Sequence, residues 1–409
     1  MAKIRLSLLL FFISGTLIAQ DIPAITPIIL SGSHNDLNVV AVSPLKFKRL
    51  AVAGWDNEVL VYQTDSPYKL VQKLSGHTAQ INALTYNFAG NMLASGGMDL
   101  SMRVYDSMYR FVPFAEDLNN RHLAAITSII FDKSGKFIFS GDKEGKLMLW
   151  DVVNKKPIKY YSTGNTINDL CLSPQAANIF VAQSDKQIKL IALAGGKVLR
   201  TMDGHTDAVN VLALSNNNQY LLSGSNDKTA RLWDLKTWKP SFVLPVESWK
   251  VTAVAFTDDS KYCVTACNDG AIKVWEVETG KLVGKTSYPE VNIRDIAFSK
   301  NNQLLIIAPK LKEGSEYGAR IVPSMVPMPV LIEPTLKIIS PAQKSLDSMM
   351  AIRPLTKQDS IKFKNILIQK PTNKNSTKMS GNKNLPGANN PIDSAVIFKT
   401  PMNSIPKKK

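Results

Sequence analysis

Hydrophobic residues recur along most of this chain in short alternating segments, separated by turns rich in Gly, Asn and Asp. The clearest run comprises residues 208–215, 220–224, 229–235 and 241–244. Alternation over such lengths is typical of half-buried antiparallel strands, because successive side chains of a strand point to opposite faces. Four such segments in one run predict a small four-stranded sheet.

One spacing repeats and defines a unit along the chain. In the clearest segment, His205 precedes Asp227 by 22 residues and Asp227 precedes Trp233 by 6. The same intervals join His34, Asp56 and Tyr62, then His77, Asp99 and Tyr105, then His122, Glu144 and Trp150. Two more copies keep the frame, one at Asp185 and one at Asp269 with Trp275. The position five residues beyond the histidine continues to Arg294, which adds a seventh unit of about 42 residues.

This Gly-His, Asp and Trp-Asp set resembles the WD-repeat (WD40) family over roughly residues 24–325. The resemblance implies an all-β, seven-bladed WD40-type β-propeller, which we assign to residues 20–334. Residues 25–30 look like an outermost strand without a blade of its own. We expect this strand to complete blade seven, because closing the ring would protect strand edges.

The resemblance also implies a structural role for the histidines, since all four of them occupy the same repeat position. In the family, this His binds the turn Asp and, through a Ser or Thr of the second strand, the Trp of the third strand. In the fifth unit the set would be His205, Asp227, Trp233 and Ser223 or Ser225. The corresponding residues of other units are His34, Asp56, His77, Asp99, His122, Trp150, Asp269 and Trp275. Such a network specifies a turn, so we expect braces and not catalysts.

Positions that vary between units are the better candidates for function. The residue directly before the turn acid is Trp55, Met98, Lys143, Ser184, Asn226 or Asn268. In the family this position faces the top of the ring and often meets a partner. A large Trp55 and Met98 beside Lys143 predict a half-apolar, half-basic patch that binds protein. The alternative is that each is only a turn residue.

A second set is expected to approach the central channel from the innermost strands. It consists of Asn82, Thr127, Asn168, Asn210, Thr252 and Arg294. A ring of amides and hydroxyls lacks the carboxylate cluster that a metal-dependent hydrolase needs. The chain also lacks a phosphate loop, a Gly-x-Ser-x-Gly elbow and a His-Glu-x-x-His stretch. We therefore predict no catalytic residue, no metal and no cofactor.

The composition adds an uneven distribution of charge. The chain has 409 residues, 44% hydrophobic and 20% charged, with a formal charge of +16. Residues 335–409 hold fourteen Lys and Arg against three Asp, and they are rich in Asn, Ser and Pro. This composition predicts a largely disordered basic tail. The tail could attract an anionic surface, but without interleaved aromatics we expect no specific nucleic-acid recognition.

The first residues indicate export. Lys3 and Arg5 precede the apolar residues 6–13, and Ala19 ends a short neutral segment. Residues 1–19 therefore have the layout of a signal peptide, of a kind similar to those of the Bacteroidota, which predicts an extracytoplasmic location. No later stretch is apolar for long enough to span a bilayer. We expect Cys171, Cys263 and Cys267 to be buried and unpaired.

These observations together predict a non-catalytic interaction scaffold of the cell envelope that binds a protein partner through the top face of the propeller. Two alternatives stay open. One is a lactonase-like propeller hydrolase that uses channel residues such as Asn168 or Arg294. The other is a protein that binds an anionic envelope polymer through the basic tail.

Overall fold

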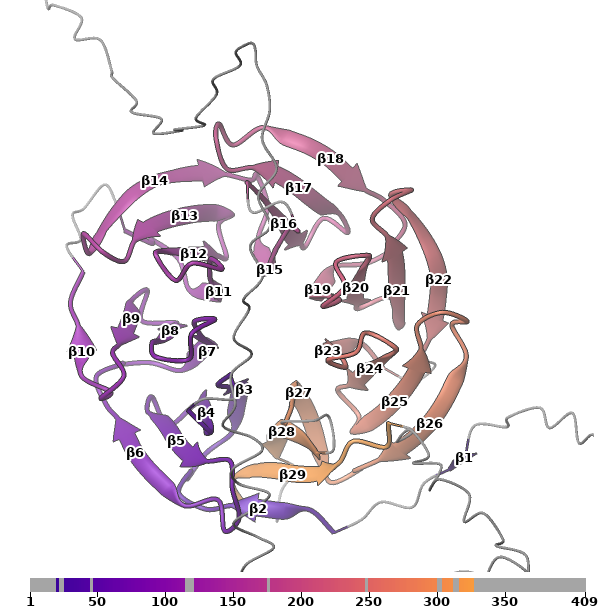
Figure 1. Ribbon diagram of the computed structural model, residues 1–409, viewed down its shortest axis with the longest axis horizontal. Helices are drawn as coiled ribbons and strands as arrows, with labels where there is room; N and C mark the ends of the chain where they lie inside the picture. Colours follow the sequence, from indigo (N-terminus) through magenta and orange to yellow (C-terminus); the bar gives the residue numbers. More distant parts are fainter. Residues whose placement is uncertain are drawn as a thin grey trace, which may run out of the picture. The chain divides into compact units, whose positions relative to one another are not determined.

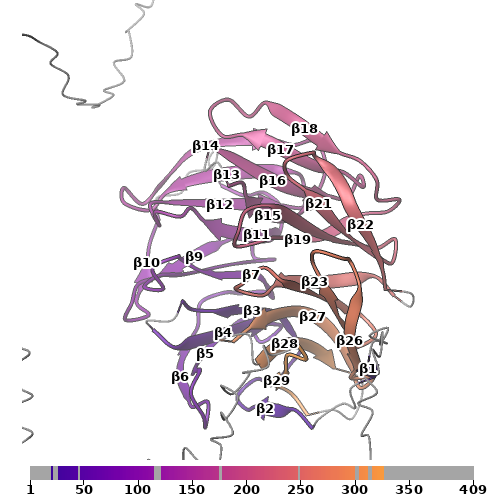
Figure 2. The same cartoon turned by 45° about the vertical axis from the view of Figure 1, so that its right-hand side comes forward.

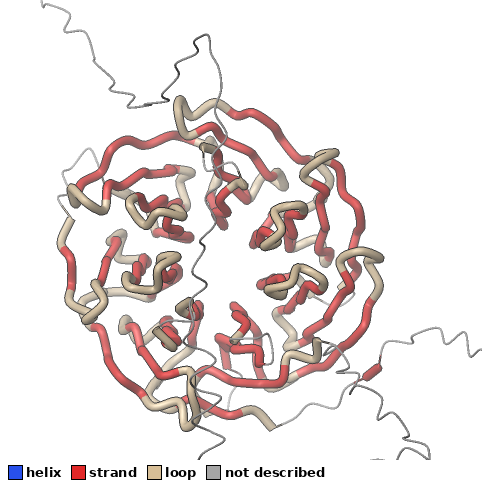
Figure 3. The backbone as a smooth tube through the Cα atoms, viewed as in Figure 1, coloured by secondary structure: helices blue, strands red, loops and turns tan. Residues whose placement is uncertain are grey.

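The computed structural model describes residues 20–21, 26–44, 47–114, 121–174, 177–246, 249–299, 304–311 and 316–326. These residues form strands joined by short loops, without a helix among them (Figure 3). The strands build seven sheets that stand radially around one axis (Figure 1). The prediction of an all-β, seven-bladed propeller is therefore confirmed. The predicted signal peptide, residues 1–19, and the predicted tail, residues 335–409, lie outside the described residues.

The first four blades follow one another along the chain, and within each blade the chain runs from the innermost strand outward. Blade one is β3 (Leu37–Val42), β4 (Arg49–Gly54), β5 (Val59–Gln63) and β6 (Leu70–Leu74). Blade two is β7 (Ile81–Tyr86), β8 (Leu93–Gly97), β9 (Met102–Tyr105) and β10 (Phe111–Val112). Blade three is β11 (Ile126–Phe131), β12 (Phe137–Asp142), β13 (Lys146–Asp151) and β14 (Lys156–Ser162). Blade four is β15 (Ile167–Leu172), β16 (Asn178–Gln183), β17 (Ile188–Ala192) and β18 (Val198–Met202).

The remaining three blades complete the ring. Blade five is β19 (Val209–Leu214), β20 (Tyr220–Ser225), β21 (Thr229–Asp234) and β22 (Lys239–Pro245). Blade six is β23 (Val251–Phe256), β24 (Tyr262–Cys267), β25 (Ala271–Glu276) and β26 (Leu282–Ser287), and β1 (Gln20–Asp21) adds a parallel fifth strand to it. Blade seven is β27 (Val291–Phe298), β28 (Leu304–Leu311), β29 (Ala319–Pro323) and β2 (Ile28–Leu30).

Blade seven combines the two ends of the repeat region. Strand β2 precedes blade one in the chain, yet it pairs antiparallel with β29, with Ile28 opposite Ile321. The innermost strand β27 also contacts β3 of blade one. The predicted closure is confirmed, and the strand that provides it is the segment Ile28–Leu30.

The hydrophobic core lies between blades and not within any one of them. Seven clusters of buried side chains each combine residues of two neighbouring blades. Trp233 of blade five, for example, packs with Phe180 and Leu190 of blade four. Because each sheet buries both faces against its neighbours, a single blade has no complete core of its own.

The innermost strand of every blade carries a β-bulge at the same place. In blade five the register slips between Val209 and Val211, so Asn210 is the extra residue. The other six inner strands slip at the corresponding position. Bulges re-aim a side chain locally, and in this propeller the re-aimed residue is the one nearest the axis.

Antiparallel pairing divides the loops of the ring between two rims. The turns between second and third strands, and the connections that enter each innermost strand, lie at one rim, which we call the upper rim. The turns that join first to second and third to fourth strands lie at the other, lower rim. The oblique view in Figure 2 shows the long outer strands that run between these rims.

Candidate functional site

The fifth blade contains a hydrogen-bonded chain of four buried side chains. Trp233 donates its Nε1 proton to Ser223 Oγ at 2.8 Å, and Ser223 lies 2.8 Å from His205 Nε2. His205 Nδ1 lies 2.8 Å from Asp227 Oδ2, which also accepts the backbone N–H of Thr206. Because the carboxylate only accepts, Nδ1 carries the proton and Nε2 accepts from the serine hydroxyl. Both imidazole nitrogens are thus occupied, and neither is free to act as a base.

The charge state of this chain agrees with its geometry. Burial lowers the pKa of His205, although the nearby Asp227 carboxylate acts in the opposite direction. The pKa of Asp227 is lowered because hydrogen bonds from Thr229, Thr206 and His205 outweigh the effect of burial. A neutral imidazole beside an ionised carboxylate is therefore the stable pair, and it fixes the turn between β20 and β21.

Blades two and three repeat this arrangement with differences. In blade two, His77 lies 2.8 Å from both Asp99 and Ser95, and Tyr105 occupies the tryptophan position. In blade three, His122 Nε2 lies 2.6 Å from Ser140 Oγ, which accepts from Trp150 Nε1 at 2.8 Å.

The acid that binds His122 is not the one that the spacing predicted. His122 Nδ1 lies 2.7 Å from Asp142 Oδ2, and the side chains of both residues are 1% exposed. Glu144, 22 residues after His122, is exposed at the turn, and its backbone N–H donates to Asp142 Oδ1. The interval therefore identified the turn but not the acid, because Asp142 ends strand β12 facing inward.

His34 was expected to be a brace, and the structure corrects this. Its side chain is exposed, and only its backbone N–H donates to Asp56, at 2.9 Å. Ser33 Oγ makes the contact to Asp56 instead, at 2.6 Å. The physical reason is that blade one has Val52 where blades two, three and five have Ser95, Ser140 and Ser223, so no hydroxyl is present to bind an imidazole.

Blade six keeps only part of the network. Trp275 Nε1 donates to Thr265 Oγ1 at 3.0 Å, and Asp269 accepts the backbone N–H of Ala271 at 3.1 Å. Among the described residues, no histidine binds the Thr265 hydroxyl in this blade.

The six predicted channel residues all line one central cavity of about 300 Å³. They are Asn82, Thr127, Asn168, Asn210, Thr252 and Arg294. Each is the bulged residue of its inner strand. The seventh member is Asn38, which sequence spacing missed by one residue because it counted from His34 to Val39.

A ring of hydrogen bonds joins these channel residues across the blade interfaces. Six of them donate a side-chain N–H or O–H to a backbone carbonyl of the next blade. The accepting carbonyl is that of the residue directly before the next channel residue, as in the bond from Asn210 to Val251 at 2.8 Å. Six interfaces have this bond, with the donors Asn38, Asn82, Thr127, Asn168, Asn210 and Thr252. The interface between blades seven and one has Arg294 at the donor position, and its Nε is buried without a partner among the described residues.

Two buried carboxyl groups border the same cavity, each directly after a channel residue. Asp169 accepts from Ser128 Oγ of blade three and from the Leu212 backbone N–H of blade five, both at 2.8 Å. Asp295 accepts from the Val40 backbone N–H of blade one at 3.0 Å. Burial raises the pKa of Asp169 to about 6 and that of Asp295 to about 7. These hydrogen bonds connect neighbouring blades, so we infer that both carboxyl groups stabilise the blade interfaces.

The predicted partner-binding residues lie together on the upper rim. The backbone N–H of each donates to the carbonyl of the residue before its own inner strand, so the rim directly adjoins the channel. These residues are Trp55, Met98, Lys143, Ser184, Asn226 and Asn268. Trp55 is 48% exposed and Met98 42% exposed, in neighbouring blades. Lys143 is also exposed, whereas Asn226 and Asn268 are half-buried.

Blade seven contributes Lys310 to the same rim position, opposite Asn292 in the sheet. Sequence reasoning missed it because this blade has no turn acid from which to count. The pairing register of β27 and β28 is what reveals the correspondence.

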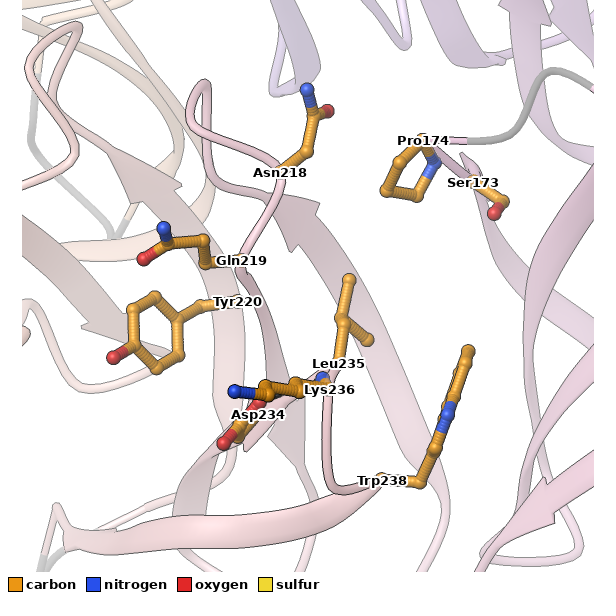
Figure 4. Close-up of a pocket in the computed structure, with 9 residues that line it drawn as sticks. All are labelled: Ser173, Pro174, Asn218, Gln219, Tyr220, Asp234, Leu235, Lys236 and Trp238. Atoms are coloured by element: carbon orange, nitrogen blue, oxygen red, sulfur yellow. Dashed lines mark hydrogen bonds between the residues drawn. The ribbon is translucent and has the colours of Figure 1, made fainter.

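A larger pocket, of about 460 Å³, opens on the lower rim between blades four and five (Figure 4). Leu235 and Trp238 of the turn between β21 and β22 lie across from Pro174 (Figure 4). The guanidinium of Arg200 covers the Trp238 ring at 4.8 Å. This pocket was not anticipated, since its walls come from turns of two different blades.

We find no further site at the cysteines of the described residues, and these residues contain neither a metal-binding cluster nor a membrane-spanning helix. Cys171, Cys263 and Cys267 are free and buried. No group of three or more His, Cys, Asp and Glu side chains is placed there to hold a metal ion. The same part contains no helix of the length and hydropathy that crossing a bilayer requires.

Comparison with known proteins agrees with the architecture. The WD40 family (WD domain, G-beta repeat) matches residues 68–106, 118–151, 196–234 and 238–276. The chain is therefore a seven-bladed β-propeller, and four of its segments are similar to the repeats of the WD40 family. Propellers of that family generally act as scaffolds for protein interaction, and most of them are not catalytic.

Individual relatives are distant. WD repeat-containing protein srw1 of Schizosaccharomyces pombe is 27% identical over 186 residues, which are 43% of this chain and 32% of that protein. Actin-interacting protein 1 of Drosophila melanogaster is 24% identical over 200 residues, 48% of this chain and 32% of that protein. A guanine nucleotide-binding protein subunit beta of Zea mays is 23% identical over 179 residues, 40% of this chain and 46% of that protein. The chain thus matches about a third of the length of the first two.

Proposed function

We propose that this protein is a non-catalytic scaffold of the cell envelope that binds a partner protein through the upper rim. The observation that carries the proposal is the pair Trp55 and Met98. Both are large apolar side chains, both are close to half exposed, and they occupy the same position of adjacent blades. An exposed aromatic side chain beside a flexible thioether is a strong source of interface energy.

The neighbouring residues support this face. Lys143 continues the row into blade three, so the apolar pair has a basic neighbour. The histidines that chemistry would need have both nitrogens occupied in blades two, three and five. The names of the matched relatives, an actin-interacting protein and a G-protein subunit, likewise describe proteins that work by association. The envelope location rests on the expected signal peptide alone.

Affinity capture from envelope extracts tests the proposal. The double variant Trp55→Ala with Met98→Ala should reduce retention of a bound protein at least tenfold, since two central contacts are lost. A matched control is available on the lower rim of blade two, where Phe88 is 74% and Met108 71% exposed. Truncating this second pair should leave retention unchanged. Loss of binding in the lower-rim variant, with retention in the upper-rim variant, would refute the assignment.

A further inference from the structure

The central ring of hydrogen bonds is interrupted at one residue. Six channel side chains are neutral amides or hydroxyls that close an interface to the next blade. Arg294 has the equivalent place in blade seven, but it makes no such bond and no ion pair in the described part of the chain. Its guanidinium therefore borders the cavity without a counter-ion from the described residues.

A second cation lies beside it at the mouth of the channel. Lys250 directly precedes β23, and its carbonyl accepts the backbone N–H of the rim residue Asn268 at 3.2 Å. Together with Arg294 it lines an opening of about 260 Å³, which Asn38, Asn82, Asn210 and Thr252 complete. Within the described residues the Lys250 ammonium has no carboxylate within ion-pair distance.

Two acids of the inner strands and their entry loops are already engaged by backbone groups. Asp295 accepts from Val40 and Ile296, and Asp36 Oδ1 accepts the N–H of Leu311 at 2.9 Å. Two like charges that converge on a small polar opening repel one another unless an anion lies between them. The arrangement is therefore suited to an external negative group.

We propose that the channel mouth between Lys250 and Arg294 binds a carboxylate of an acidic segment of the partner protein. This inference rests on the proposed function, because the rim that carries Trp55 and Met98 surrounds this opening. A singly charged carboxylate suits the site better than a doubly charged phosphate, because two acidic residues, Asp169 and Asp295, also line the central cavity. The opening would thus select the acidic residue, and the rim would hold the apolar ones around it.

Hexaglutamate peptide is the probe, titrated calorimetrically at low salt into the full-length protein. Arg294→Gln and Lys250→Gln should each weaken its affinity at least tenfold, while Arg294→Lys keeps most of it. Lys133→Gln is the control, since it removes an exposed charge from the turn between β11 and β12 on the lower rim. The basic tail is common to all variants, so differences between them report on the channel. Hexaglutamine should not bind.

The outcomes are separable. Equal affinity in both charge variants and the control would overturn the inference, as would inorganic phosphate displacing the peptide at a lower concentration than glutamate does. Should Arg294→Gln fail to fold, Lys250→Gln at the edge of the mouth decides alone. Partner capture that survives both charge variants but not the Trp55 and Met98 truncations would refute this inference and leave the scaffold function standing. If the peptide binds at the channel mouth but no partner protein is captured, the anion-binding site is supported and the scaffold function is refuted.

Discussion

Ser223 joins the tryptophan and histidine of blade five, so removing its hydroxyl tests the bracing role directly. The side chain is fully buried, and its Oγ lies 2.8 Å from both Trp233 Nε1 and His205 Nε2. Ser223→Ala leaves one buried donor and one buried acceptor without partners. Each costs about 1–3 kcal/mol, and the space of one oxygen admits no well-bonded water, so we expect a loss of about 2–4 kcal/mol.

The assay is the shift of the urea midpoint at constant slope, together with the melting temperature, which should fall by roughly 5 °C. Ser225→Ala is the matched control. Ser225 is as buried as Ser223 and two residues away, but its partners are backbone groups: its hydroxyl donates to the carbonyls of Asp207 and Ala208 and accepts the N–H of Asp227. These contacts are only partly buried, so water can replace the lost hydroxyl, and the Ala208 carbonyl keeps the Asn226 N–H. Ser225→Ala should therefore cost about 1 kcal/mol. A Ser223→Ala protein as stable as the wild type, or less affected than Ser225→Ala, would refute the reasoning.

Three further perturbations follow from the buried acids. In blade three, Asp142→Ala should lower the melting temperature by several degrees, whereas Glu144→Ala should lie within about one degree of wild type. Hydrogen bonds from His77 and Thr78 outweigh burial and lower the pKa of Asp99 to about 2. The contribution of ionised Asp99 to the stability of the fold is therefore complete above pH 3.8 and is lost as the pH falls to 2. The Asp99→Asn protein should not show this loss of stability in an acid titration. Burial raises the pKa of Asp295 to about 7, so the folded state keeps a proton that the unfolded state loses near pH 3.8. The stability of the wild-type protein should therefore decline as the pH rises from 4 to 7. The urea midpoint of Asp295→Asn should depend less on pH over this range.

The repeat spacing was enough to predict the blades and the composition of most braces. Strand alternation, Gly and Asn turns and the interval from His205 to Asp227 are local properties, which the sheet pleat and the turn geometry dictate. The strand that closes the ring was also visible, because residues 25–30 had strand character but no blade of their own. The place of Trp55 and Met98 on the rim followed from their position beside a turn acid.

Other features depended on contacts between blades. Spacing selected Glu144 where the fold uses Asp142, and it pointed to Val39 where a bulge presents Asn38 to the channel. Neither error could be seen along the chain. The first depends on which of two nearby acids reaches His122 once the turn has folded, and the second on a bulge that shifts the strand pairing by one residue. The lower-rim pocket around Trp238 likewise has walls from two blades.

The sequence alone therefore determined what repeats within one unit: four short strands, a braced turn and a variable residue on the rim. Only the tertiary structure decided what happens where units meet, including the blade-spanning carboxyls Asp169 and Asp295 and the missing bond at Arg294. The physical reason is that a propeller buries its core and closes its channel between sheets whose residues lie 40 or more positions apart, and hydrogen bonds across such distances leave no local pattern.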